Sequence, residues 1–124
     1  MKHLVKLALE NLSTKDYFLF RVLCEACGMV YGSKTVRFSK ADAPPQTGSR
    51  KPLYEALYEQ EFKCAQAIAI REAAEQLNYC PICKRLVCNR CFLICEELDM
   101  CAACAEMLEE AGVPVMPEAL EIAI

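Results

Sequence analysis

Residues 80–104 read CPICKRLVCNRCFLICEELDMCAAC, and this stretch holds seven of the ten cysteines in the 124-residue chain. Six of the seven form C-x-x-C pairs, and one further pair lies upstream. The four pairs are Cys24/Cys27, Cys80/Cys83, Cys88/Cys91 and Cys101/Cys104. The two sulfurs of one pair can bind the same ion at about 2.3 Å, and two pairs complete a tetrahedral zinc site. The pattern therefore predicts two zinc ions, with Cys64 and Cys95 left unassigned.

Ten cysteines would also suit the disulfide framework of a secreted domain, which needs a signal peptide. Residues 1–15 (MKHLVKLALENLSTK) carry Lys6 inside their apolar stretch and lack a small-residue cleavage site. They predict instead an amphipathic helix over residues 2–12. Its apolar face has Leu4, Val5, Ala8, Leu9 and Leu12, and its polar face has Lys2, Lys6 and Glu10. We therefore expect a cytoplasmic protein without a membrane span, in which clustered thiols bind metal rather than form disulfides.

The pairs can share two ions in more than one way. Sites in series would join the first pair to the second and the third to the fourth, and a compact single site would use the second and third pairs. Only four residues, 84–87, separate the second pair from the third, which makes two sites in series awkward. This spacing favours a cross-brace, in which alternate pairs share an ion. Site 1 then consists of Cys24, Cys27, Cys88 and Cys91, and site 2 of Cys80, Cys83, Cys101 and Cys104.

The runs CPICKRLVCNRCF (80–92) and LDMCAACAEML (98–108) resemble the second half of a FYVE-type zinc finger, a treble-clef, RING-like cross-brace domain. The likeness covers residues 24–107 and includes all eight paired cysteines in the family's order. It implies cross-brace ligation of two zinc ions, with the final pair on a short helix. The chain departs from the family in the 52-residue gap between the first two pairs, which would hold a helical insertion.

The residues with which FYVE domains bind lipid do not carry over. The family binds phosphatidylinositol 3-phosphate through a basic, histidine-rich stretch beside the second pair, and here residues 75–80 read EQLNYC. The only histidine, His3, lies near the N-terminus, where we expect an ordinary surface residue. RING fingers place a histidine among their ligands, which disfavours a ubiquitin ligase. The resemblance therefore implies the scaffold without the lipid ligand.

The segments around the first pair predict a small β structure. An aromatic and β-branched run over residues 17–23 predicts a strand that leads into the first pair. Gly28 suits the positive φ that a knuckle turn needs after its second cysteine. Further β character over residues 29–31 and 34–38, with a turn at Gly32-Ser33, predicts a hairpin on the first zinc site.

The remaining segments predict an α+β fold, a small two-zinc cross-brace finger with a β-hairpin and a long inserted helix. Prolines and small polar residues over 39–51 predict a linker, and Pro52 opens a helix that extends to Asn78 as its C-cap. The last cysteine pair should lie in the first turn of a helix with Asp99 as N-cap and residues 112–114 as its stop. We expect an N-terminal helix over 1–16, a FYVE-like zinc-binding domain over 17–112 with inserted helix 52–78, and a tail over 113–124.

The apolar side of the long helix is wide for a surface helix. It comprises Leu57, Phe62, Ala65, Ile68, Ala69 and Ala73. We interpret it as the main core element of the domain, and a homodimer interface is the alternative. We expect Cys64, in the same helix, to be a small buried core residue. We expect Cys95 to be a half-buried thiol. The alternatives are that it replaces one of the paired cysteines as a metal ligand, or that it is a redox-sensitive thiol.

Charge is divided unevenly along the chain. Residues 1–91 carry a net +5, and residues 92–124 hold eight acids and no base, which gives −8 and a total of −3. Each zinc with four thiolates contributes roughly −2 in addition. A chain this negative is a poor general binder of nucleic acid.

A nucleic-acid-associated regulator is the alternative function, working through the basic hairpin face. Its candidate nucleic-acid or anion contacts are Lys34, Arg37, Lys40, Lys84, Arg85 and Arg90. We favour the interpretation that these bases offset the anionic zinc centres and keep the surface soluble. Closed four-thiolate sites have no open coordination position, so we expect no enzymatic activity. The sequence predicts a non-catalytic zinc-binding protein that acts as an adaptor or protein-interaction module.

Removal of metal tests the structural role of zinc. A core this small depends on its metal, so we expect a strong chelator to abolish the far-UV circular dichroism of the folded state. Retention of the full signal and of Tm after complete metal removal would contradict that role.

Overall fold

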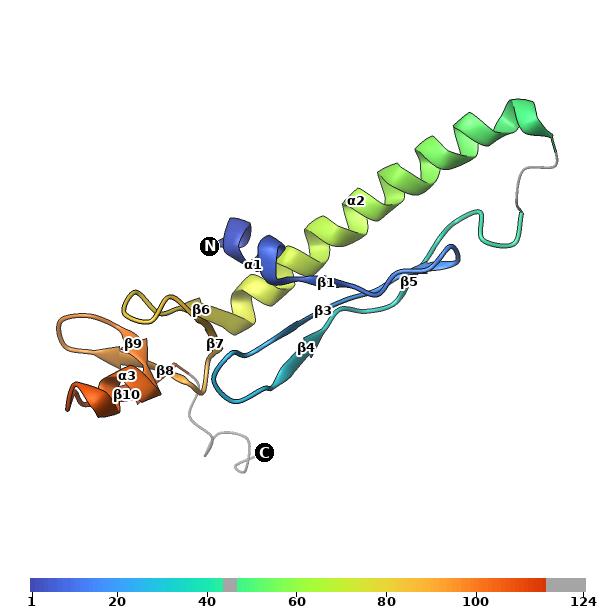
Figure 1. Ribbon diagram of the computed structural model, residues 1–124. Helices are drawn as coiled ribbons and strands as arrows, with labels where there is room; N and C mark the ends of the chain where they lie inside the picture. The colour runs from blue at the N-terminus through green and yellow to red at the C-terminus, as the bar shows by residue number, and fades with distance from the viewer. Residues whose placement is uncertain (44–46, 116–124) are drawn as a thin grey trace.

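The computed structural model describes residues 1–43 and 47–115. The molecule is elongated: a long helix and a β-ribbon lie side by side, and a small lobe rich in cysteine lies at one end (Figure 1). The elements are α1 (Lys2–Ala8), β1 (Glu10–Asn11), β2 (Tyr17–Phe18), β3 (Phe20–Leu23), β4 (Val30–Gly32), β5 (Val36–Arg37), the 3-10 helix η1 (Gly48–Arg50), α2 (Lys51–Gln76), β6 (Leu77–Tyr79), β7 (Leu86–Cys88), β8 (Phe92–Cys95), β9 (Met100–Cys101), α3 (Ala102–Met107) and β10 (Gly112–Pro114). This confirms the predicted α+β class. Of the predicted tail, residues 116–124 lie outside the described ranges.

The β-ribbon is built from two short antiparallel sheets. Strand β3 pairs with β1 and β4, and β2 pairs with β5. The predicted hairpin on the first cysteine pair is confirmed, but its turn is the cysteine knuckle between β3 and β4. The turn expected at Gly32-Ser33 is wrong, because Ser33 instead exchanges hydrogen bonds with the backbone of Phe20. The chain therefore runs on along the ribbon to β5.

The N-terminal helix is shorter than the expected 2–12. It ends at Ala8, and Leu9 is extended with φ −70° and ψ 127°. Glu10 and Asn11 then pair with the free edge of β3, where the Glu10 carboxylate accepts a hydrogen bond from Arg21 at 3.1 Å. Backbone bonds to an existing strand replace the last helical turn.

The long helix begins as predicted but ends two residues early. Pro52 lies in its first turn, and Leu77 leaves the helix with φ −126° and ψ 154°. Asn78 is not a C-cap: it lies in β6 opposite Val87, and its side chain donates to Asn89 at 2.8 Å. Pairing of β6 with β7 satisfies the backbone groups that a longer helix would have used.

The ribbon and α2 share an aromatic core. The rings of Phe18, Phe20 and Phe38 are fully buried under the helix. From α2 they meet Tyr54, Tyr58 and Phe62, at ring-centroid distances of 5.0 to 5.9 Å. The small side chains of Ala65 and Ala69 let the ribbon come close to the helix.

The predicted apolar side of α2 is only partly buried. Ala65, Ala69 and Ala73 are buried, Leu57 and Phe62 are half-buried, and Ile68 is 45% exposed. A second cluster of Val5, Val22, Ala73 and Leu77 joins α1 and β3 to the end of α2. The helix therefore serves as the core element of the N-terminal half. In the described ranges, no helix has the length and apolar character needed to cross a membrane.

Loss of one buried ring should destabilise this half strongly. We expect Phe18→Ala to lower the free energy of unfolding by about 3–5 kcal/mol, because it removes a ring that contacts three others and leaves a cavity. Urea denaturation of the zinc-loaded protein measures the change. Leu53→Ala is the control, since Leu53 is 58% exposed on α2 and should cost less than about 0.5 kcal/mol. Equal losses for the two variants would contradict this packing.

Candidate metal centres

Two turns of the same shape present the first and second cysteine pairs. The first connects β3 to β4 and the second connects β6 to β7. In each, the N–H that follows the second cysteine donates at 2.9 Å to the carbonyl of the first, from Gly28 to Cys24 and from Lys84 to Cys80. Both donors have positive φ, 77° for Gly28 and 64° for Lys84. The conformation predicted at Gly28 is confirmed, and Lys84 adopts it at a cost of about 1–2 kcal/mol.

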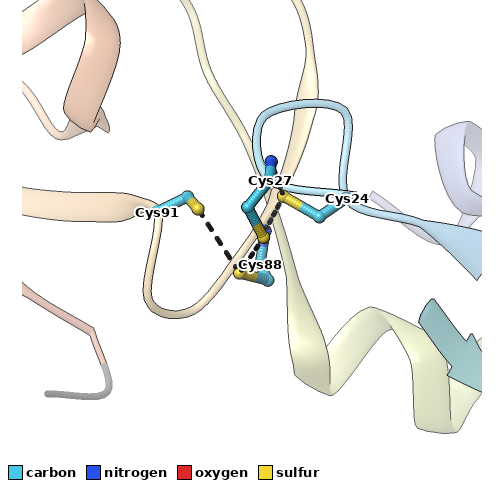
Figure 2. A group of neighbouring side chains, drawn as sticks. All are labelled: Cys24, Cys27, Cys88 and Cys91. Atoms are coloured by element: carbon cyan, nitrogen blue, oxygen red, sulfur yellow. Dashed lines mark hydrogen bonds between the residues drawn. The ribbon is translucent and has the colours of Figure 1, made fainter. Parts of the chain in front are cut away.

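The structure brings the eight paired cysteines into two groups of four. One group contains Cys24, Cys27, Cys88 and Cys91, and the other contains Cys80, Cys83, Cys101 and Cys104. Within each group all ligand atoms lie within 4.8 Å of one another. This is the cross-brace order: the first pair meets the third, and the second meets the fourth. Figure 2 shows the first group, where the ribbon tip carrying Cys24 and Cys27 approaches the turn carrying Cys88 and Cys91.

The spacing of the sulfurs suits a tetrahedral ion. The Sγ–Sγ distances are 3.7 Å from Cys27 to Cys88 and 3.6 Å from Cys88 to Cys91. In the second group, Cys83 and Cys101 are 3.7 Å apart, and Cys80 and Cys104 are 3.9 Å apart. Four sulfurs at about 2.3 Å from a central zinc would be separated by about 3.8 Å. Each group can therefore hold one metal ion, and an all-thiolate tetrahedron favours zinc.

The second group ends on helix α3, although its cap differs from the expected one. Cys101 is the N-cap, and its Sγ accepts the N–H of Cys104 at 3.4 Å, so the last pair occupies the first turn as predicted. Asp99 is not the cap, because its carboxylate accepts the N–H of Cys95 at 3.1 Å and closes the β8–β9 loop. The helix ends at Met107, and the predicted stop at residues 112–114 forms β10 against β8.

Backbone N–H groups favour the thiolate form of one sulfur in each group, Cys24 in the first and Cys80 in the second. Burial raises the pKa of Cys24, but hydrogen bonds from the N–H groups of Cys27, Cys88 and Ala26 lower it to about 7. The bond from Cys88 crosses between knuckles at 3.2 Å, and Cys101 donates to Cys80 in the same way at 3.4 Å. Thiolate is the form that binds metal.

Other sulfurs of the same groups resist ionisation because thiolates repel. Burial and the neighbouring Cys88 and Cys27 raise the pKa of Cys91 far above its usual value. Burial and the other three sulfurs of its group raise the pKa of Cys104 to about 12. Four adjacent thiols cannot all lose their protons without a compensating charge, and a divalent cation supplies it. The donor set thus fits zinc, which would be held by four sulfurs in each group and would supply structural cross-linking.

Arg85 links the second group to the first knuckle. Its side chain donates to Cys83 at 3.3 Å and to Cys101 at 3.8 Å, and it also reaches the carbonyl of Glu25 at 3.1 Å. The guanidinium lowers the pKa of Cys83 to about 6. Glu25 belongs to the first knuckle, and its N–H donates to the carbonyl of Leu86 at 2.9 Å. The sequence did not distinguish this arginine from the other bases.

The six candidate nucleic-acid or anion contacts lie in three separate places. Lys34, Arg37 and Lys40 lie on or beside the ribbon, where Arg37 forms an ion pair with Asp42. Lys84 and Arg85 belong to the second knuckle, and Lys84 lines a cavity of about 230 Å³ with Leu4 and Leu7 of α1. Arg90 lies beside the first group, with its guanidinium 3.3 Å from the Met29 sulfur. Of the six, Arg85 therefore serves the second cysteine group.

The two unpaired cysteines and the histidine lie outside both groups. Cys64 is exposed on α2, so its predicted burial is wrong: the ribbon covers the neighbouring Ala65 instead. Cys95 is half-buried as expected, and its thiol lies 3.9 Å from the carbonyl of Leu93. His3 is exposed on α1.

Metal replacement tests the pairing directly. We expect chains loaded with cadmium-113 to give two metal resonances. One should correlate with the β-protons of both Cys24 and Cys88, and the other with those of Cys80 and Cys101, because alternate pairs share an ion. A resonance shared by Cys24 and Cys80 would indicate sites in series and contradict the cross-brace.

Comparisons of the chain with models of protein families, with curated proteins and with solved structures found no significant match. The chain folds as a small α+β protein whose two four-cysteine groups fit a cross-brace zinc finger.

Proposed function

We propose that this chain is a non-catalytic zinc-binding module that recruits another protein. The observation that carries the proposal is the pair of closed four-sulfur groups. A zinc ion with four thiolates has no position for a reacting water or substrate, so its role is to hold the fold. Zinc thiolates persist in reducing compartments, which supports a cytoplasmic location.

The scaffold that we propose is a FYVE-like finger with an insertion. The order of the pairs, their alternate grouping and the last pair at the start of α3 support this likeness. The insertion between the first two knuckles contains β4, β5 and α2. The segment before Cys80 pairs with β7 as strand β6, and it lacks the basic residues of the lipid-binding family. Lipid recognition therefore forms no part of the proposal.

The face that we assign to partner binding lies on the C-terminal lobe. Ile94 of β8 and Val113 of β10 are paired on adjacent strands, and they are 53% and 64% exposed. Contiguous exposed apolar surface marks protein-interaction sites, and we assign this pair as the centre of such a surface.

The charge of the C-terminal lobe indicates the chemistry of the partner. Residues 92–115 hold six acids and no base, and all six are exposed: Glu96, Glu97, Asp99, Glu106, Glu109 and Glu110. An acidic lobe that also exposes an apolar pair complements a basic amphipathic segment and speeds its approach. We therefore propose that the partner presents such a segment.

Affinity capture with matched surface variants tests this function. The baits are the wild-type chain, Ile94→Glu with Val113→Glu, and Leu53→Glu as a control on exposed α2. We expect one partner to be captured by the wild type and the control and lost from the double variant. Its purified complex should weaken by about tenfold or more on the double substitution, because charges would replace the apolar centre.

Two results would contradict the proposal. One is equal capture by all three baits, each first shown to bind zinc and to keep its circular dichroism. The other is tight binding of nucleic acid with a steep dependence on salt, which would favour the nucleic-acid function through the basic residues.

A further inference from the structure

The two cysteine groups differ in how well their sulfurs are protected from solvent. In the second group Cys80, Cys101 and Cys104 are buried and Cys83 is half-buried. In the first group, by contrast, Cys27 is exposed. Reagents in solution therefore reach the first group more easily than the second.

The exposed sulfur faces an open hollow. A cavity of about 530 Å³ is lined by Cys27 and Cys91 together with Gly28, Met29 and Arg90. Gly28 has no side chain, and even a Cβ at this position would meet no atom within 4 Å. Gly28 therefore leaves its side of the hollow open, and the hollow is large enough to admit a small molecule.

The sulfurs also differ in the donors that reduce their nucleophilicity. Arg85 donates to both Cys83 and Cys101 of the second group. In the first group the backbone donors concentrate on Cys24, which accepts from three N–H groups. Hydrogen bonds to a metal-bound thiolate withdraw electron density and make it less reactive. Among the described residues, Cys27 accepts from the N–H of Met29 but has no arginine donor like that of Cys83, and it is the exposed sulfur of its group.

The first group alone connects the two halves of the described chain by metal ligation. Cys27 and Cys88 are 61 residues apart, and they tie the ribbon tip to the C-terminal lobe. The second group lies entirely within residues 80–104. Loss of an ion from the first group would therefore remove the metal cross-link between the ribbon tip and the C-terminal lobe while the second group stays closed, and would leave hydrogen bonds such as those of Glu25 with Arg85 and Leu86 at this junction.

We propose that Cys27 is a reaction site for small hydroperoxides, and that oxidation there releases the zinc of the first group selectively. This inference rests on the proposed zinc occupancy. The Cys27 thiolate attacks the peroxide, so that an S–O bond forms, the O–O bond breaks and an alcohol or water leaves with a proton from solvent. The Cys88 thiolate, 3.7 Å away, then forms the S–S bond and expels hydroxide, which takes a second proton. The two sulfurs lose two electrons, the peroxide gains them, and zinc is left with two ligands.

The experiment uses the full chain loaded with zinc and hydrogen peroxide as the probe. Native mass spectrometry first counts the ions, then a chromogenic indicator follows zinc release, and peptide mapping locates the oxidised thiols. We expect one zinc per chain to leave about tenfold or more faster than the other, with a disulfide between Cys27 and Cys88. Binding of fewer than two ions before peroxide is added would contradict the proposed function itself. Two bound ions that leave at equal rates, or first from the second group, would contradict only this inference.

Two variants separate Cys27 from other thiols. Cys64→Ser removes the exposed thiol on α2 and should leave the fast release unchanged. Cys27→His keeps a zinc ligand but removes the nucleophilic sulfur, so the fast phase should slow by about tenfold or more. Loss of the fast phase in Cys64→Ser, or its persistence in zinc-loaded Cys27→His, would overturn the assignment. If the histidine variant binds only one ion, peptide mapping of the oxidised wild-type chain is the deciding measurement: a disulfide between Cys27 and Cys88 supports the assignment, and its absence overturns it.

Discussion

Close contact between cysteine sulfurs is the interaction on which the C-terminal half of the molecule depends. Sulfurs 3.6 to 3.9 Å apart repel one another once ionised, and a central divalent cation converts that repulsion into attraction. The buried cluster around them has only a few other members, Val87, Phe92, Met100 and Ala105. Cysteines therefore take the place of the apolar side chains that would fill a larger core, and the energy of ligation becomes energy of folding.

The N-terminal half is held together by different means. Its core is a cluster of aromatic rings between the ribbon and α2, with alanines where the two approach. No cysteine ligand belongs to this cluster. The ribbon extends from this half to the first knuckle, so the apolar arm and the cysteine-rich lobe are joined at the first cysteine group.

The sequence allowed the chemistry to be predicted better than the boundaries of the elements. Four C-x-x-C pairs with a four-residue spacer favoured the cross-brace, since metal ligands are fixed by side-chain type and spacing. The missed features depend on tertiary partners. Residues 9–12 have a helical pattern, but in the structure residues 10 and 11 pair with the edge of β3. Asn78 is a suitable helix cap by residue type, but it pairs with β7 instead. Lys84 takes a conformation that favours glycine, and nothing local indicates this. The role of Arg85 follows only from where the fold places the sulfurs of Cys83 and Cys101.

Zinc content with the coordination of each ion is the most direct test of the two-ion cross-brace. The purified chain should contain two zinc ions, and X-ray absorption at the zinc edge should show four sulfurs at about 2.3 Å around each. A single ion per chain, a shell containing oxygen or nitrogen, or disulfides in place of metal would contradict it.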